Sequence, residues 1–416
     1  MSFSLPSEEL SAWIRLTLEP GLGPAQARLL LAGIGLPQDI YALPSASLAK
    51  ILPQDLARQL SRPASPQIEE TIARTLKWLG EPGHHLVTLA DPGYPQALLD
   101  IHDPPLALYV NGRVELLNRP ALAIVGARNA TAGGLDNAAA FARYLAGRGW
   151  CIASGLALGI DAAAHKGALA AGQHAGGTIA VLGTGIDLIY PAANLELAHR
   201  IAAEGALVSE FPLGTPSIAY QFPKRNRIVA GLAKGVLVVE AAKRSGSLIT
   251  ARLAAEMGRE VFAIPGSIHS PQSRGCHALI RQGAKLVESG QDIDEELGQL
   301  PSSPSSANAR PETTVQRKTG GENTRGAALQ GSQGAADLFS AGADPEDHAA
   351  TPAAADDGGA RTQHAELLAA LGYDPVHIDI LQARTGLDWP LLNSQLLELE
   401  LDSVVMRLPD GRFQRR

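Results

Sequence analysis

The sequence predicts an α/β protein built on a doubly wound, mostly parallel, Rossmann-like sheet. Apolar runs recur from residue 121 onward, and Ala-rich helical segments separate them. The runs are continuous rather than alternating, which is typical of strands buried on both faces of a parallel sheet. Because strand–helix–strand units cross over in a right-handed sense, their repetition predicts a doubly wound sheet.

The expected core spans residues 117–297. Its strands are predicted at 121–127, 150–156, 178–184, 206–211, 235–241 and 260–264, with a shorter one at 285–289. Helices are predicted between them at 135–147, 160–171, 193–204 and 247–258.

Four further segments flank this core. Residues 1–65 predict short helices around the turn Pro20-Gly21-Leu22-Gly23, either a helix-hairpin-helix whose N–H groups face a phosphate or ordinary packed helices. Residues 66–116 are proline-rich and predict an extended connecting segment. Residues 298–361 are rich in Ser, Ala, Gly and Pro and predict a flexible linker. Residues 362–416 predict three helices and a hairpin, the pattern of a winged-helix domain.

Composition narrows the class of protein further. The 416 residues exceed one ordinary domain, and 45% apolar with 19% charged residues excludes wholesale disorder. Two cysteines, Cys151 and Cys276, form neither a disulfide framework nor a cysteine-rich zinc site. The start MSFSLPSEEL lacks the features of a secretory signal, and no apolar run is long enough to span a membrane. We therefore expect a cytoplasmic protein without a membrane partner.

Charge is distributed unevenly along the chain. The formal net charge is −7, yet residues 117–297 hold 17 Lys and Arg against 14 Asp and Glu. A basic core inside an acidic chain is the electrostatic footprint expected of a polyanion-binding protein.

The loops that follow the predicted strands carry most of the glycines and cations. In an open parallel sheet these loops meet at the carboxyl edge, where ligands bind. Helix starts there expose N–H donors, and nearby Arg and Lys add charge-assisted hydrogen bonds. The candidate residues are Gly126, Arg128, Ser154, Gly155, Lys224, Arg225, Asn226, Arg227, Lys243 and Ser245.

The sequence lacks the motifs that mark several classes of enzyme. The first strand is followed by GARNATAGG rather than G-x-G-x-x-G, and no P-loop occurs. The histidines are scattered, so neither a metal nor a cofactor is expected. Asp161 and Asp187 could act as acid and base, but we expect Asp161 to cap a helix. No nucleophile–base pair is recognisable, which argues against an enzyme.

The densest cluster of positive charge is Lys224-Arg225-Asn226-Arg227. Three cations in four residues cannot all be buried without partners. A solvated, basic helix start is one interpretation. The position of this cluster at the carboxyl edge, with Arg128 and Lys243 on neighbouring loops, favours a polyphosphate ligand instead.

At these residues the sequence resembles the DNA-processing protein A (DprA/Smf) family. The strings that carry the resemblance extend over the whole 117–297 segment, and the most specific are FPKRNRIVAGL (222–232) and SGSLITA (245–251). VGARNATAGG (125–134) and AVLGTGIDLIYPAAN (180–194) also match. Gln272 and His277 depart from the glycine and asparagine that the family tends to have there.

The resemblance implies a non-enzymatic, cytoplasmic homodimer that binds single-stranded DNA. It also implies protection of incoming DNA and loading of the RecA recombinase during natural transformation. Arg128 and Lys224 are the leading DNA contacts by motif. The remaining candidate residues named above lie in the matching loops.

Two other functions remain as alternatives. A nucleotide phosphoribohydrolase of the lysine-decarboxylase-like type would need a PGGxGT string, where this chain reads EAAKRSGSLIT. A duplex-binding regulator would read DNA with PLLNSQLLELELD, which holds acids and no Lys or Arg. Only Tyr190, Tyr220 and Phe222 supply aromatic rings near the expected cleft, so an extended stacking platform is not expected.

Overall fold

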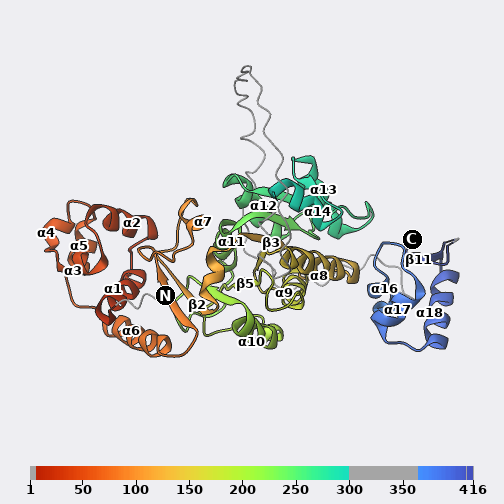
Figure 1. Ribbon diagram of the computed structural model, residues 1–416, viewed down its shortest axis with the longest axis horizontal. Coiled ribbons are helices and arrows are strands. Elements are labelled where there is room, and N and C mark those ends of the chain that lie inside the picture. Colours follow the sequence, from red (N-terminus) through yellow and green to blue (C-terminus); the bar gives the residue numbers. More distant parts are fainter. Residues whose placement is uncertain (1–5, 299–363, 409, 416) are drawn as a thin grey trace, which may run out of the picture. The chain divides into compact units, whose positions relative to one another are not determined.

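The structure is a computed structural model that describes residues 6–298, 364–408 and 410–415. Its central element is a sheet with the strand order β1-β2-β6-β5-β4-β3-β7-β8-β9 (Figure 1). The strands are β1 His84–Thr88, β2 Ala107–Gly112, β3 Ala121–Val125, β4 Cys151–Ser154, β5 Thr178–Val181, β6 Ala206–Ser209, β7 Ala233–Val238, β8 Glu260–Ala263 and β9 Lys285–Leu286.

The seven strands from β3 to β9 are parallel, as the sequence predicts. The chain winds outward from β3 through β4 and β5 to β6, then returns and continues on the other side of β3 with β7. The strand order therefore reverses between β3 and β7. Such a reversal opens a crevice at the carboxyl edge of a doubly wound sheet.

Helices cover both faces of this sheet. Helices α8 (Ala132–Gly147) and α9 (Ile160–Ala170) lie on one face, and α11 (Gln221–Leu232) and α12 (Gly246–Glu256) lie on the other (Figure 1). The side chains of β3 alternate between the two apolar clusters, with Leu122 packed toward α8 and α9. Burial on both faces explains why these strands read as continuous apolar runs.

Shorter helices complete the core. They are α7 Gln96–Leu99, α10 Leu195–Glu204, α13 Arg274–Arg281 and α14 Gly290–Leu297, with 3-10 turns at Val114–Asn118, Ala192–Asn194 and Pro271–Ser273.

The segment 66–116 is more than the extended connection that the sequence predicts, and that prediction was wrong. Helix α6 (Pro66–Leu79) begins it, with Ser65 as its N-cap. Strands β1 and β2 then form an antiparallel hairpin, and β2 pairs antiparallel with β6. The prolines of this segment lie outside the two strands, where they leave the hydrogen-bonded ladder intact.

The N-terminal helices form a bundle with its own apolar cluster around Trp13 and Leu30. They are α1 Ser7–Leu18, α2 Pro24–Gly33, α3 Pro37–Ala42, α4 Ser45–Leu48 and α5 Gln54–Leu60. Gly21, in the predicted turn between α1 and α2, has φ +78°, a conformation that favours glycine.

The C-terminal segment folds as the predicted three helices and hairpin. Helices α16 (Ala365–Leu371), α17 (Ile378–Thr385) and α18 (Trp389–Leu401) precede strands β10 (Val405–Arg407) and β11 (Phe413–Arg415). The two strands pair antiparallel, and the helices pack on a cluster that contains residues of this segment alone.

Apart from Gly298, the linker predicted at 298–361 lies outside the described residues. Among the helices of the described ranges, none is both long and apolar enough to cross a membrane.

Candidate nucleic-acid interface

Arg128 and Lys243 project from the loops on either side of the crevice between β3 and β7. Both side chains are exposed. The backbone of Arg128 packs against Gly159, which has φ +74°. A Cβ at position 159 would lie 2.4 Å from the Arg128 carbonyl oxygen, so this close approach requires glycine. The Ile160 N–H also donates to the Ala127 carbonyl at 3.2 Å. The chain thus fixes the base of the Arg128 side chain, and within the described residues its guanidinium makes no hydrogen bond or ion pair, so it can meet an anion.

Arg225 is buried beneath the turn that follows β4. Its guanidinium donates to the Val181 carbonyl and packs so closely on Gly155 that a Cβ there would lie 2.2 Å from Nη1. Burial lowers the pKa of Arg225 to about 10, although Asp161 opposes this shift. The Arg225 side chain therefore supports the edge from below instead of facing solvent.

Asp161 lies in the first turn of α9, but it does not cap that helix as the sequence predicts. Its Oδ2 accepts hydrogen bonds from the N–H groups of Gly155 at 3.0 Å and Ala157 at 3.4 Å. Burial raises the pKa of this carboxyl, and Arg225 is the largest opposing influence. Asp161 thus holds the glycine turn and balances the buried guanidinium, which leaves it unsuited to proton transfer at the surface.

Lys224 lies in the first turns of α11, and its ammonium faces the edge. Its Nζ lies 3.8 Å from Glu210 Oε2 and 5.5 Å from the centroid of the Phe211 ring. The side chain is 39% exposed. In the described part of the chain the ammonium makes no hydrogen bond, so its N–H donors remain available.

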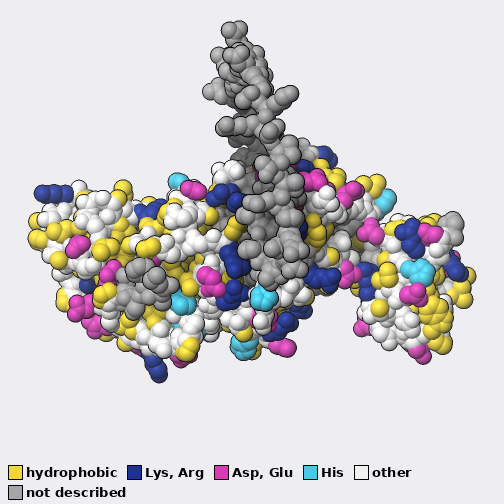
Figure 2. All heavy atoms as spheres, in the orientation of Figure 1, with side chains coloured by type: hydrophobic (Ala, Val, Ile, Leu, Met, Phe, Trp, Pro, Cys, Tyr) yellow, Lys and Arg dark blue, Asp and Glu magenta, His cyan; other side chains and the backbone are white. Residues whose placement is uncertain are grey.

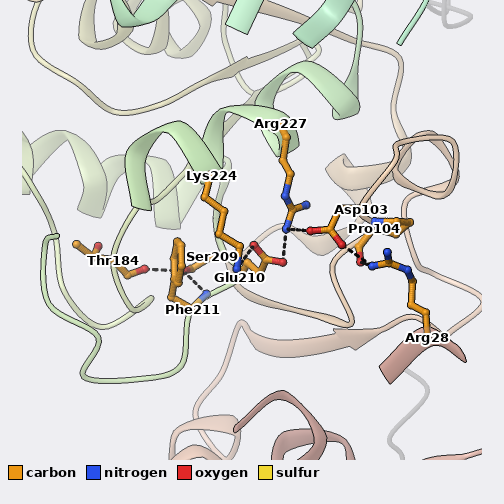
Figure 3. A network of polar contacts seen from close by, with 9 residues as sticks. All are labelled: Arg28, Asp103, Pro104, Thr184, Ser209, Glu210, Phe211, Lys224 and Arg227. Carbon is orange, nitrogen blue, oxygen red and sulfur yellow. Dashed lines mark hydrogen bonds and ion pairs between the residues drawn. The ribbon is translucent and has the colours of Figure 1, made fainter. Parts of the chain in front are cut away.

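Arg227 is buried in a network of charges that is drawn in Figure 3. Its Nη2 donates to Glu210 Oε1 and lies 3.7 Å from Asp103 Oδ2. Asp103 in turn accepts from Arg28 of helix α2 at 2.6 Å. The carboxylates come from the loop after β6 and from the segment before β2, so residues distant in sequence neutralise Arg227.

The structure divides the predicted site residues into three groups. The first group, Arg128, Lys224 and Lys243, presents cations to solvent. The second group is half-buried and includes Asn226. Gly126 and Ser245 are also half-buried, and Ser245 caps α12 by accepting from the Ser247 N–H at 3.3 Å.

The third group comprises the buried residues Ser154, Gly155, Arg225 and Arg227. The Ser154 hydroxyl donates to the Ile124 carbonyl at 2.6 Å. These four residues are buried in the described structure, and their direct contact with a ligand stays a prediction. Each one is enclosed by protein and supports the edge.

Glu240 is a residue of this edge that the sequence reading missed. It follows β7 at the crevice, and its carboxylate accepts from Thr131 N–H at 2.9 Å and Thr131 Oγ1 at 2.6 Å. Burial raises the pKa of the Glu240 carboxyl. In dinucleotide-binding folds the pyrophosphate occupies this helix start. Here an internal carboxylate takes that place, which argues against a nucleotide bound in the same way.

Figure 2 shows Lys and Arg side chains gathered on the central part of one face, with acidic side chains between them. No group of three or more metal-ligating side chains occurs among the residues that the structure describes. The fold and the edge together define a doubly wound α/β protein whose carboxyl edge presents cations to solvent.

The chain belongs to the family described as DNA recombination-mediator protein A, which matches residues 85–298. A second match, the DprA winged helix domain, extends over residues 348–411. Both agree with the sequence resemblance and with the fold.

Individual relatives support this membership. The chain is 40% identical to protein Smf of Escherichia coli over 83% of this chain and 82% of that protein. It is 48% identical to DNA processing protein DprA of Streptococcus pneumoniae over 50% of this chain and 72% of that one. A solved structure of DNA processing protein A from Streptococcus pneumoniae aligns with TM-score 0.59 and 35% identity, covering 71% of this chain and 99% of that chain. These names describe DNA processing and recombination mediation, and none of them names a catalytic reaction.

Proposed function

We propose that this protein binds single-stranded DNA along the carboxyl edge of its sheet, with Arg128, Lys224 and Lys243 on the phosphates. The observation that carries the proposal is the state of Lys224. Glu210 and the Phe211 ring hold its ammonium in place, yet no hydrogen bond within the described residues uses its donors. A phosphate oxygen would supply the missing acceptors with charge-assisted bonds.

Protein surface of this kind suits a single strand better than a duplex. The edge consists of glycine turns and helix starts, and it projects no long helix that could enter a major groove. Helix α18 of the winged helix bears the exposed acids Glu398 and Glu400 and no Lys or Arg. Acidic side chains repel phosphates, so this helix is a poor reader of duplex DNA.

Equilibrium titration compares the two forms of DNA. Fluorescence anisotropy should measure Kd for a labelled dT oligonucleotide, a mixed-sequence single strand and a duplex of the same length at one fixed salt concentration. We expect both single strands to bind more tightly than the duplex, and the dT strand most tightly, because weakly stacked bases splay at least cost. Equal affinity for the duplex would refute the proposal and favour the winged helix as the DNA reader.

Family membership supports a wider role. We further propose that the protein acts in the cytoplasm as a homodimer, protects incoming DNA and loads RecA on it in natural transformation. A dimer would place two binding edges on one strand, so affinity should rise once an oligonucleotide reaches both. Sedimentation of the protein alone, and RecA filament assembly on protein-coated dT strands, test these two steps separately.

A further inference from the structure

A row of alternating charges extends from the N-terminal bundle to Lys224 (Figure 3). It begins at Arg28 of α2, continues through Asp103, Arg227 and Glu210, and ends at Lys224. We call these five side chains the charge row. They come from α2, the segment before β2, the loop after β6, and α11. The charge row therefore joins the bundle to the lysine that we place on the phosphates.

Apolar packing fixes the bundle against the sheet, so the first contact of the charge row has a firm base. Ile14 of α1 lies in one apolar cluster with Tyr109 of β2. Leu106, just before β2, belongs in turn to the cluster of the bundle. These contacts hold α2 and the segment before β2 in one arrangement, in which Arg28 meets Asp103.

Asp103 is shared unequally between two arginines. Its Oδ1 lies 2.6 Å from Arg28 Nη1, whereas its Oδ2 lies 3.7 Å from Arg227 Nη2. Arg28 Nη1 also donates to the Pro104 carbonyl at 3.2 Å, which holds the guanidinium in place. Because the attraction between charges falls with distance, Arg28 is the stronger partner of Asp103. Arg227 is thus left mainly to Glu210.

Glu210 is shared in a similar way at the other end of the charge row. Its Oε1 accepts a hydrogen bond from Arg227, and its Oε2 lies 3.8 Å from Lys224 Nζ. This Oε2 is buried and accepts no hydrogen bond from any described residue. A small movement of the lysine would give Oε2 a donor and take that donor away from a phosphate. The hold of Arg227 on Glu210 therefore affects how free Lys224 is.

The middle of the charge row lies in the protein interior, where charges act on one another strongly. The side chains of Arg227 and Glu210 are 11% and 10% exposed. Beside them, burial raises the pKa of Tyr94, and Arg227 and Glu210 are the charged groups that act most on its hydroxyl. Little water screens these charges, so a change at one pair is felt at the next.

We propose that Arg28 is a positioning residue for DNA binding: by holding Asp103, it keeps Arg227 on Glu210 and the ammonium of Lys224 free for a phosphate. Without Arg28, the unpaired Asp103 draws Arg227 toward itself, and the charge of Glu210 then turns to Lys224. This inference rests on the proposed function. It makes the N-terminal bundle a determinant of DNA affinity without any contact between the bundle and the strand.

The test measures Kd for a labelled dT oligonucleotide by anisotropy at one fixed salt concentration. The full chain is compared with Arg28→Gln, with Arg28→Lys, which keeps the charge, and with the double variant Arg28→Gln/Asp103→Asn. Lys224→Ala is measured with and without Arg28→Gln. Arg28 lies outside the apolar cluster of the bundle, so Arg28→Gln should fold like the wild type, which circular dichroism checks.

Two controls separate this effect from a change in net charge. Arg58→Gln removes an exposed cation of the same bundle, whose side chain is 55% exposed. Arg28→Gln/Asp39→Asn has the same net charge as Arg28→Gln/Asp103→Asn, but Asp39 is an exposed residue of α3 outside the charge row.

We expect Arg28→Gln to weaken binding to dT about fivefold, a typical size for coupling through a network of packed side chains. Arg28→Lys and Arg28→Gln/Asp103→Asn should bind like the wild type, because neither leaves Asp103 as an unpaired charge. In the Lys224→Ala background, Arg28→Gln should have no further effect. Arg58→Gln should match the wild type, and Arg28→Gln/Asp39→Asn should remain as weak as Arg28→Gln.

Three results would overturn the inference. Wild-type affinity in Arg28→Gln would show that the charge row does not affect binding. An equal loss in the Lys224→Ala background would mean that Arg28 contacts the strand itself. Recovery in Arg28→Gln/Asp39→Asn would mean that net charge alone is responsible.

Failure of the proposed function gives a different pattern. If the wild type does not bind dT, or if Lys224→Ala binds as tightly as the wild type, the proposed edge is wrong. If Lys224→Ala binds weakly and Arg28→Gln binds normally, the edge stands and the role of Arg28 is refuted.

Discussion

Replacing Arg225 by methionine should destabilise the core even though the helix and the side-chain length are preserved. The substitution removes the hydrogen bond to the Val181 carbonyl and leaves Asp161 buried without its compensating cation. A hydrogen bond from a charged group contributes about 1.5–3 kcal/mol, and an unpaired buried charge costs about 3–5 kcal/mol. No direct ion pair joins Arg225 to Asp161, so we expect the lower value, about 3 kcal/mol.

Urea unfolding followed by circular dichroism measures this loss. The double variant Asp161→Asn/Arg225→Met should recover about half of it, because the asparagine carries no charge and its side-chain oxygen still accepts from Gly155. Arg200→Met is the matched control, since Arg200 is exposed and only 3.9 Å from Glu204 in a surface pair. That substitution should change the free energy of unfolding by less than about 0.5 kcal/mol.

Acidification gives an independent readout. Burial raises the pKa of Asp161 in the folded chain, and the loss of Arg225 raises it further. A folded state that takes up a proton more readily than the unfolded chain gains stability as the pH falls. The loss in free energy of unfolding that Arg225→Met causes should therefore become smaller as the pH falls from 7 to 5. A deficit that is independent of pH, or that persists in the double variant, would refute the compensating role of Arg225.

Two other outcomes follow from the same structure. Gly155→Ala should destabilise the core in the same urea unfolding experiment, because the added Cβ displaces the Arg225 guanidinium. Gly147→Ala is the control: it lies in the last turn of α8 with no atom within 4 Å of the added Cβ, so it should be neutral or stabilising. Deleting residues 299–416 should leave a folded core that binds dT, because no described apolar cluster joins the winged helix to the core. Loss of DNA binding by the truncated chain, with an unchanged circular dichroism spectrum, would place the binding site in the deleted segment.

The parallel part of the sheet was predictable because each strand from β3 to β8 contains a continuous apolar run followed by glycine, charged or polar residues. The hairpin of β1 and β2 was not, because Pro104 and Pro105 come just before β2 and make the segment read as an extended connection. Such a segment looks like a connection until β6 supplies a partner with free backbone groups.

The candidate site was predictable in its place but not in its details. The sequence locates the cations at the carboxyl edge, and Lys224 and Arg128 do face solvent there. It does not reveal that Arg225 and Arg227 are buried, because their counter-charges come from distant positions: Asp161 for Arg225, and Glu210 and Asp103 for Arg227. Local sequence carries no signal for such pairs.

The most direct test of DNA binding at this edge is the salt dependence of Kd for a dT oligonucleotide. It is measured for the wild type, Arg128→Ala, Lys224→Ala and the control Lys234→Ala, whose exposed lysine lies at the amino end of β7 on the opposite edge. Each of the first two variants should bind more weakly and lower the slope of log K against log salt by about 0.7, the value for one single-strand phosphate contact. Lys234→Ala should match the wild type. Wild-type affinity and slope in Arg128→Ala and Lys224→Ala would show that the strand binds elsewhere.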